Sequence, residues 1–298
     1  MSQRITSSKA KSILAPNSSP AKQFNYTGSL WRDFIQETLA LTKRLFIQLQ
    51  RRPSTLIAGV IQPFMWLVLF GALFSKAPQS LFGDDLSYAR FLAPGVIVFT
   101  AFSGALNAGL PVMFDREFGF LNRLLVAPLA SRYSIVAAST IYIITLSFIQ
   151  TAVIIAAGAF LGAGLPSLEG LSAIVLIVFL IVLGVTAVSL GLAFALPGHI
   201  ELIAVIFVTN LPLLFASTAL APLNFMAGWL QVIASLNPLT YAIQPIRYLY
   251  LHSDWTLSSM VMNTPWGSVS FGSDILVLLA FDALVLFTIQ PLLRRRFA

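Results

Sequence analysis

Long runs of hydrophobic residues, separated by short polar stretches, dominate the chain from residue 55 onwards. A helix needs around 20 residues to cross the hydrocarbon core of a membrane, which is about 30 Å thick. Six runs are long enough, at about 55–75, 91–113, 133–162, 170–197, 200–222 and 273–293. The pattern therefore predicts an all-α membrane protein with six transmembrane helices.

Two further segments place hydrophobic and charged residues on opposite faces of a helix, as helices lying along a membrane surface do. The first covers residues 30–50, and the second covers residues 115–131, between the second and third runs. On the second helix the hydrophobic face holds Phe114, Phe118, Leu121 and Leu125, and the polar face holds Asp115, Arg116, Gly119, Asn122 and Arg123. This segment is either a solvated connector or the contact for a soluble partner.

The region between the fifth and sixth runs, about 223–272, is apolar but interrupted. Residues 225–236 are too few to cross a membrane, and Asn237-Pro238 separates them from a second apolar piece at 239–251. We therefore predict short external re-entrant helices before the last span. They form either a cap over an exit route or a passive lid.

Composition agrees with a membrane protein, because only 10% of the 298 residues are charged and the mean hydropathy is +0.86. Fifteen of the 18 Lys and Arg residues precede the first run, follow the second run or end the chain. The positive-inside rule then places both termini and segment 115–131 in the cytoplasm. Residues 1–27 are predicted to be a disordered basic tail, with an organelle transit peptide as the alternative. We expect no nucleic-acid partner, since the net charge of +7 lies mostly at the ends of hydrophobic runs.

The sequence offers no motif for a catalytic, nucleotide or metal site. It has no Cys and no G-x-x-x-x-G-K-[ST] phosphate loop. The two histidines, His199 and His252, fall on opposite sides of the membrane in the predicted topology and cannot share a zinc ion. We therefore predict no enzyme activity, metal or cofactor for this chain itself.

Few polar groups lie inside the predicted spans. Asp282 is near the middle of the sixth run, where a charge costs at least about 2.5–3.5 kcal/mol, so it should face protein or water. Asn107 and Asn210 are single polar groups of the kind that also joins neighbouring helices. All three residues are candidates either for a substrate path or for polar packing.

Three function classes remain. A secondary transporter usually has matching halves and charged pairs for ion coupling, and the two halves of this chain do not match. An intramembrane enzyme needs a nucleophile or a metal site, and the sequence offers neither. The membrane part of a machine driven by another polypeptide explains the missing ATP site and the two amphipathic helices together.

Three motifs resemble those of the membrane subunits of type-two ABC exporters. They are FLAPG at 91–95, REFGFLNRLLVAP at 116–128, and LNPLTY at 236–241 followed by Arg247. The resemblance covers the chain from about residue 28 and is closest to the daunorubicin-resistance and nodulation-factor exporter permeases. Phe120 and Asn122 depart from the usual Thr and Glu of the second motif, and Gln244-Pro245 stands where an acidic residue is common.

The resemblance implies a permease subunit that forms a homodimer in the lipid bilayer and binds two separate ATPase subunits, which hold ATP and Mg. Segment 115–131 would be the coupling helix, with Arg116, Glu117 and Arg123 contacting the ATPase and with Phe118 and Leu121 anchoring the helix to the bundle. ATP-driven closure would shift spans two and five at the dimer interface.

An amphiphilic drug, lipid or glycolipid would then be exported between the two copies. The expected location is a bacterial plasma membrane. An ion-coupled secondary transporter that acts without an ATPase partner is the alternative.

Overall fold

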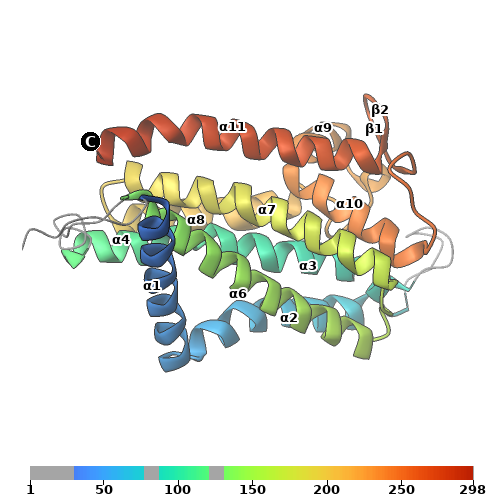
Figure 1. The fold of residues 1–298 in the computed structure, drawn as a ribbon. Coiled ribbons are helices and arrows are strands. Elements are labelled where there is room, and N and C mark those ends of the chain that lie inside the picture. The colour runs from blue at the N-terminus through green and yellow to red at the C-terminus, as the bar shows by residue number, and fades with distance from the viewer. Residues whose placement is uncertain (1–29, 77–86, 121–130, 298) are drawn as a thin grey trace, which may run out of the picture.

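The computed structural model describes residues 30–76, 87–120 and 131–297 (Figure 1). Its helices are α1 (Leu30–Arg51), α2 (Ser54–Leu73), α3 (Tyr88–Leu106), α4 (Gly109–Glu117), α6 (Tyr133–Phe160), α7 (Leu168–Ala195), α8 (His199–Phe215), the 3-10 helix η2 (Leu223–Phe225), α9 (Gly228–Leu236), α10 (Pro238–Leu251) and α11 (Phe271–Phe297). Strands β1 (Met260–Thr264) and β2 (Gly267–Ser270) pair antiparallel before α11. The regular elements among the described residues are therefore helices as predicted, apart from this hairpin, which the hydrophobic pattern did not indicate.

Five helices among the described residues are long and apolar enough to cross a membrane. They are α2, α6, α7, α11 and the helix that α3 and α4 form together. The fifth predicted run, 200–222, instead forms the 17-residue α8. Helix α8 ends at Phe215, and the Asn237 side-chain amide donates to the carbonyls of Leu213 and Ala216 at 2.8 and 2.6 Å. The prediction of six long helices is corrected to five, because side-chain capping ends α8 before its apolar run ends.

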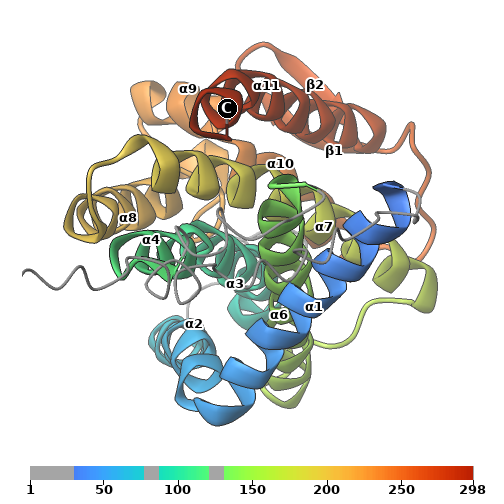
Figure 2. The same ribbon diagram turned by 60° about the vertical axis from the view of Figure 1, so that its left-hand side comes forward.

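Helix α3 is the central helix of the bundle (Figure 2). It contacts α2, α6, α7 and α10, and every residue from Phe91 to Phe102 is buried. A helix that is apolar on all sides belongs inside a protein or a membrane, and here the protein itself encloses it. Residues 91–102 are thus enclosed by this chain, and the expected position of span two, about 91–113, at a dimer interface stays a prediction for its exposed part around Asn107.

Helix α1 lies across one end of the bundle rather than along it (Figure 1). It packs on α6, with Thr38, Thr42 and Leu45 buried. Trp31 and Leu39 on the same helix are 70% and 60% exposed. The amphipathic helix predicted at 30–50 is present, but only part of its hydrophobic face is covered by the chain. We call this the α4 end of the bundle, because α4 and the turn between α7 and α8 lie there too.

The opposite end, the hairpin end, carries α9, α10 and the strands β1 and β2 (Figure 1). The break predicted at Asn237-Pro238 separates α9 from α10, and the Asn237 side chain caps α10 by accepting from Leu239 N at 3.0 Å. Helix α10 packs against α3, α7 and α11. It is therefore part of the bundle rather than an external cap.

Candidate functional site

Helix α4 is fixed to α7 at its first residue. The Ser189 hydroxyl on α7 donates to the Leu106 carbonyl at 2.6 Å and accepts from the Gly109 N–H at 2.9 Å. A Cβ added at Gly109 would lie 2.4 Å from the Ser189 carbonyl oxygen. Glycine at 109 is what lets the two backbones approach so closely. The predicted run 91–113 is thus divided into two helices at the point where the chain meets α7.

Arg116, near the end of α4, binds the C-terminus of α7. Its guanidinium donates to the carbonyls of Ala193, Leu196 and Pro197 at 2.8, 2.6 and 2.5 Å. The last carbonyls of a helix have no partner within the helix and carry partial negative charge, so a cation is favourable there. Arg116 therefore caps α7.

Glu117, the next residue, binds the N-terminus of α8. One carboxylate oxygen accepts from the His199 N–H at 2.6 Å, and the other contacts His199 Nδ1. A carboxylate at the first helical N–H groups satisfies a free donor and matches the positive end of the helix. Together Arg116 and Glu117 hold the two sides of the α7–α8 turn.

Helix α4 is also tied to α1. The Arg44 guanidinium binds both oxygens of Asp115, at 2.9 and 3.1 Å, and lies 3.9 Å above the centre of the Phe120 ring. The two residues belong to the two segments predicted to be amphipathic, at 30–50 and 115–131, and the sequence pattern did not indicate that they pair. Their opposite charges on two amphipathic helices at one membrane surface were the available signal.

The predicted ATPase contacts divide into three groups. Arg116 and Glu117, on α4, point to the α7–α8 turn and bind it within the same chain. Phe118 stacks on Phe114 at 6.0 Å but is 78% exposed, so its predicted anchoring to the bundle is limited to this contact in the described structure. Leu121 and Arg123 lie outside the described residues.

The three path candidates separate into a pair and a single residue. The Asn107 amide donates to the Ser103 carbonyl at 2.7 Å, and the Ser103 hydroxyl donates to Asn210 Oδ1 at 3.2 Å. Asn107 and Asn210 therefore meet at Ser103, between α3 and α8. Asp282 is buried on α11 and faces Gly184 of α7, where an added Cβ would lie 2.2 Å from the carboxylate. It packs α11 onto α7 and does not join the other two.

Arg247 joins two of the motifs at the hairpin end. The buried guanidinium donates to the Phe91 carbonyl at 3.2 Å and the Thr218 carbonyl at 2.7 Å, and lies 3.8 Å above the centre of the Phe91 ring. Burial lowers the pKa of Arg247 to about 9, which still leaves it charged at neutral pH. Arg247 thus binds the first residue of the FLAPG motif through carbonyl oxygens.

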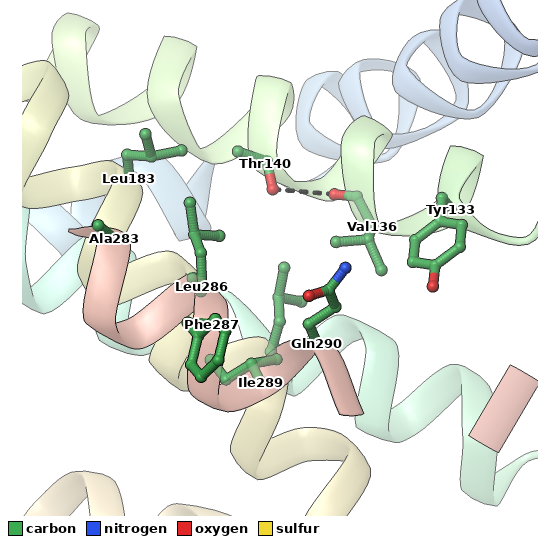
Figure 3. A pocket seen from close by; sticks show the side chains of 11 residues that line it. Tyr133, Val136, Thr140, Leu183, Ala283, Leu286, Phe287, Ile289 and Gln290 are labelled. Atoms are coloured by element: carbon green, nitrogen blue, oxygen red, sulfur yellow. Dashed lines mark hydrogen bonds between the residues drawn. The ribbon is translucent and has the colours of Figure 1, made fainter. Parts of the chain in front are cut away.

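Two cavities lie near the α4 end of the described structure. A cavity of about 510 Å³ between α6, α7 and α11 is lined mainly by apolar side chains (Figure 3). Its few polar residues are Tyr133, Thr140 and Gln290, and the Thr140 hydroxyl is bonded to the Val136 carbonyl of its own helix. A second cavity, of about 770 Å³, lies between α1, α2, α4 and α6 and has a more polar lining.

The sequence matches a known family over most of this structure. Residues 36–251, which run from α1 to the end of α10, match the family described as ABC-2 type transporter. The chain belongs to this family. As an ABC-2 permease it is a multi-pass membrane protein and the transport subunit of an ABC transporter, and ATP hydrolysis belongs to a separate ATPase subunit.

Relatives of this permease include both near and distant proteins. A protein of Cyanophora paradoxa named as a transport permease, ycf38, is 54% identical over 89% of this chain and 91% of its own. A protein of Porphyra purpurea with the same name has the same identity and coverage. More distant is a protein of Mycobacterium tuberculosis named as a doxorubicin resistance ABC transporter permease, DrrC, which is 28% identical over 82% of this chain and 85% of its own.

Proposed function

We propose that two copies of this permease form an exporter with two separately encoded ATPase subunits, which bind ATP and Mg at the α4 end. The substrate is an amphiphilic drug, lipid or glycolipid. Family membership supports the ATPase partner. The names of DrrC and of the daunorubicin resistance permease DrrB1 of Streptomyces coeruleorubidus, 27% identical over 72% of this chain, support the substrate class.

The clamps of Arg116 and Glu117 on the α7–α8 turn carry this proposal. The ATPase contacts the segment that follows α4, beginning at the exposed Phe118. A displacement of α4 reaches the end of α7 and the following turn through three hydrogen bonds of Arg116, and it reaches α8 through Glu117. Arg116 and Glu117 are therefore positioning residues for coupling, and the direct contacts lie further along the coupling segment.

The path between the copies runs along the side of the bundle that carries α2 and α8 (Figure 2). Exposed apolar side chains on this side, such as Ile61 and Phe207, support contact with a second copy or with lipid. The Asn107–Ser103–Asn210 group supplies polar atoms on the same side. A path with this mixture suits an amphiphile.

The α4 end faces the cytoplasm in this proposal, because most Lys and Arg residues belong to that end by the positive-inside rule. A bacterial plasma membrane is supported by the relatives from Mycobacterium, Streptomyces and Escherichia. The more similar ycf38 permeases come from Cyanophora and Porphyra. Fractionation of membranes from the native organism, followed by detection of the chain, distinguishes a plasma membrane from an organelle membrane.

The test is Glu117→Ala, reconstituted into vesicles with the ATPase subunit. We expect the variant to insert in the membrane and to bind the ATPase, while transport per ATP hydrolysed falls several-fold, because the α8 terminus is released. Glu169→Ala is the matched control. Glu169 is an exposed acid in the first turn of α7, at the other end of that helix from the α7–α8 turn, and its loss should leave coupling unchanged.

Normal transport per ATP in Glu117→Ala would contradict the clamp. Transport by the permease alone, driven by an ion gradient, would contradict the whole proposal in favour of a secondary transporter. The two outcomes are separable because only the second removes the need for the ATPase.

A further inference from the structure

The polar cavity of about 770 Å³ at the α4 end lies inside the elbow between α1 and α2. Its polar lining comes mainly from the end of α1 and the first turn of α2, namely Gln48, Arg51, Arg52 and Thr55. Ligand pockets are typically about 300–1,000 Å³, so the cavity has the volume of a ligand site. Neither the clamps of α4 nor the predicted substrate path uses it.

The charges around this cavity favour an anion. Asp115 is the one carboxylate among the described lining residues, and Arg44 already binds both of its oxygens. Arg51 and Arg52 make no ion pair with the described part of the chain. Two guanidinium groups without a carboxylate partner are suited to a phosphate group, which offers paired oxygen acceptors.

The surroundings of the cavity favour a phosphate that belongs to a lipid. Helix α1 is amphipathic and lies across the bundle end, and α2 begins after Pro53 with the apolar sequence of a span. An apolar groove of about 340 Å³ between α2 and α6 begins at Leu56, the residue after Thr55. An anionic head in the cavity and an acyl chain along α2 would occupy both spaces.

We propose that the cavity inside the α1–α2 elbow binds the headgroup of an anionic phospholipid from the adjacent membrane leaflet, with Arg51 and Arg52 holding the phosphate. The site depends on the proposed function only in that α1 lies at the membrane surface. Phe118, where the proposed ATPase contact begins, also lines the cavity, but the two arginines that hold the phosphate take no part in that contact. Failure of the lipid site and failure of the proposed function therefore have different signatures.

The test is a titration of the full-length permease, purified in a phosphate-free nonionic detergent, with dioctanoyl phosphatidylglycerol. Binding is read by native mass spectrometry. Each arginine near anionic lipid contributes about fivefold to affinity, so Arg51→Gln with Arg52→Gln should raise the Kd at least about tenfold. The control is Lys43→Gln with Lys76→Gln, which removes the same charge at two exposed positions outside the cavity and should leave the Kd unchanged.

Gln48→Glu gives a second variant that keeps both arginines. It places a carboxylate in the cavity at an exposed position, so the chain should fold, and it should also weaken binding of phosphatidylglycerol. Melting temperatures of all variants identify any loss of folding. If the arginine double variant does not fold, the test rests on Gln48→Glu, and unchanged binding of phosphatidylglycerol by that variant would contradict the proposal.

Three results would overturn the proposal. Equal loss of binding in the arginine and lysine double variants would indicate attraction to net charge only. Equal affinity for inorganic phosphate would indicate a free anion rather than a lipid. Unchanged lipid binding together with loss of ATPase co-purification in the arginine variant would assign the cavity to the protein partner.

Discussion

Arg116 and Arg247 lie at opposite ends of the bundle, and both bind carbonyl oxygens instead of carboxylates. Arg116 is partly exposed and caps the end of α7, where water can replace it. Arg247 is buried, stacks on Phe91 and bonds to two carbonyls that water does not reach. The same guanidinium-to-carbonyl bonds therefore form a partly solvated contact at the α4 end and a buried contact at the hairpin end.

The largest effect is expected for Arg247→Ala. The change leaves the carbonyls of Phe91 and Thr218 buried without this donor, which costs about 1–3 kcal/mol each, and opens a space beside Phe91. Thermal unfolding of the detergent-purified protein measures this loss. Arg247→Lys keeps the charge but not the planar guanidinium, so its melting temperature should lie between those of the unchanged protein and Arg247→Ala. A melting temperature equal to that of the unchanged protein in Arg247→Ala would remove the distinction between the two ends.

A smaller effect on stability is expected for Arg116→Ala, because water can satisfy the exposed helix end. We expect a loss of about 0.5–1.5 kcal/mol in thermal unfolding, together with a marked fall in transport per ATP hydrolysed. Arg116→Lys reaches fewer of the three carbonyls and should recover part of the coupling. If Arg116→Ala destabilises the protein as much as Arg247→Ala while transport per ATP stays normal, the two arginine contacts do not differ in the way described.

The smallest effect is expected for the ion pair between Arg44 and Asp115, which supplies a third kind of arginine contact. Both side chains are about 30% exposed, and pairs of this kind contribute about 0.2–1 kcal/mol. Arg44→Ala should lower the melting temperature slightly, and less so at high salt. The exchange of both residues, Arg44→Asp with Asp115→Arg, should restore the melting temperature that Arg44→Ala lowers. A loss above that of Arg116→Ala would show that α1 is more than an auxiliary support.

Periodicity predicted the positions of the helices because burial of an apolar face is a local property of the sequence. It placed α1 at 30–50 and the break at Asn237-Pro238, where a capping side chain and a proline mark a helix start. It missed the division at Gly109, since the reason is a serine 80 residues further along the chain. It also missed the hairpin of β1 and β2, which is too short for a clear alternation.

The candidate site was predictable only in part. The sequence identified Arg116 and Glu117 but did not indicate their bonds within the chain, because both partners lie about 80 residues away, at the end of α7 and the start of α8. The exposure of Phe118 was missed for a related reason: α4 ends at Glu117, so the wheel of a continuous helix does not apply beyond it. Helical periodicity describes faces within one helix and says little about contacts between helix ends.

The Arg247 contact connects α10 to the start of α3 and to the turn after α8 at one end of the bundle. If the proposed ATPase displaces α4, this contact would hold the hairpin end in place. The helices would then change their tilt about that end, and the largest displacement would be expected where α4 meets the α7–α8 turn.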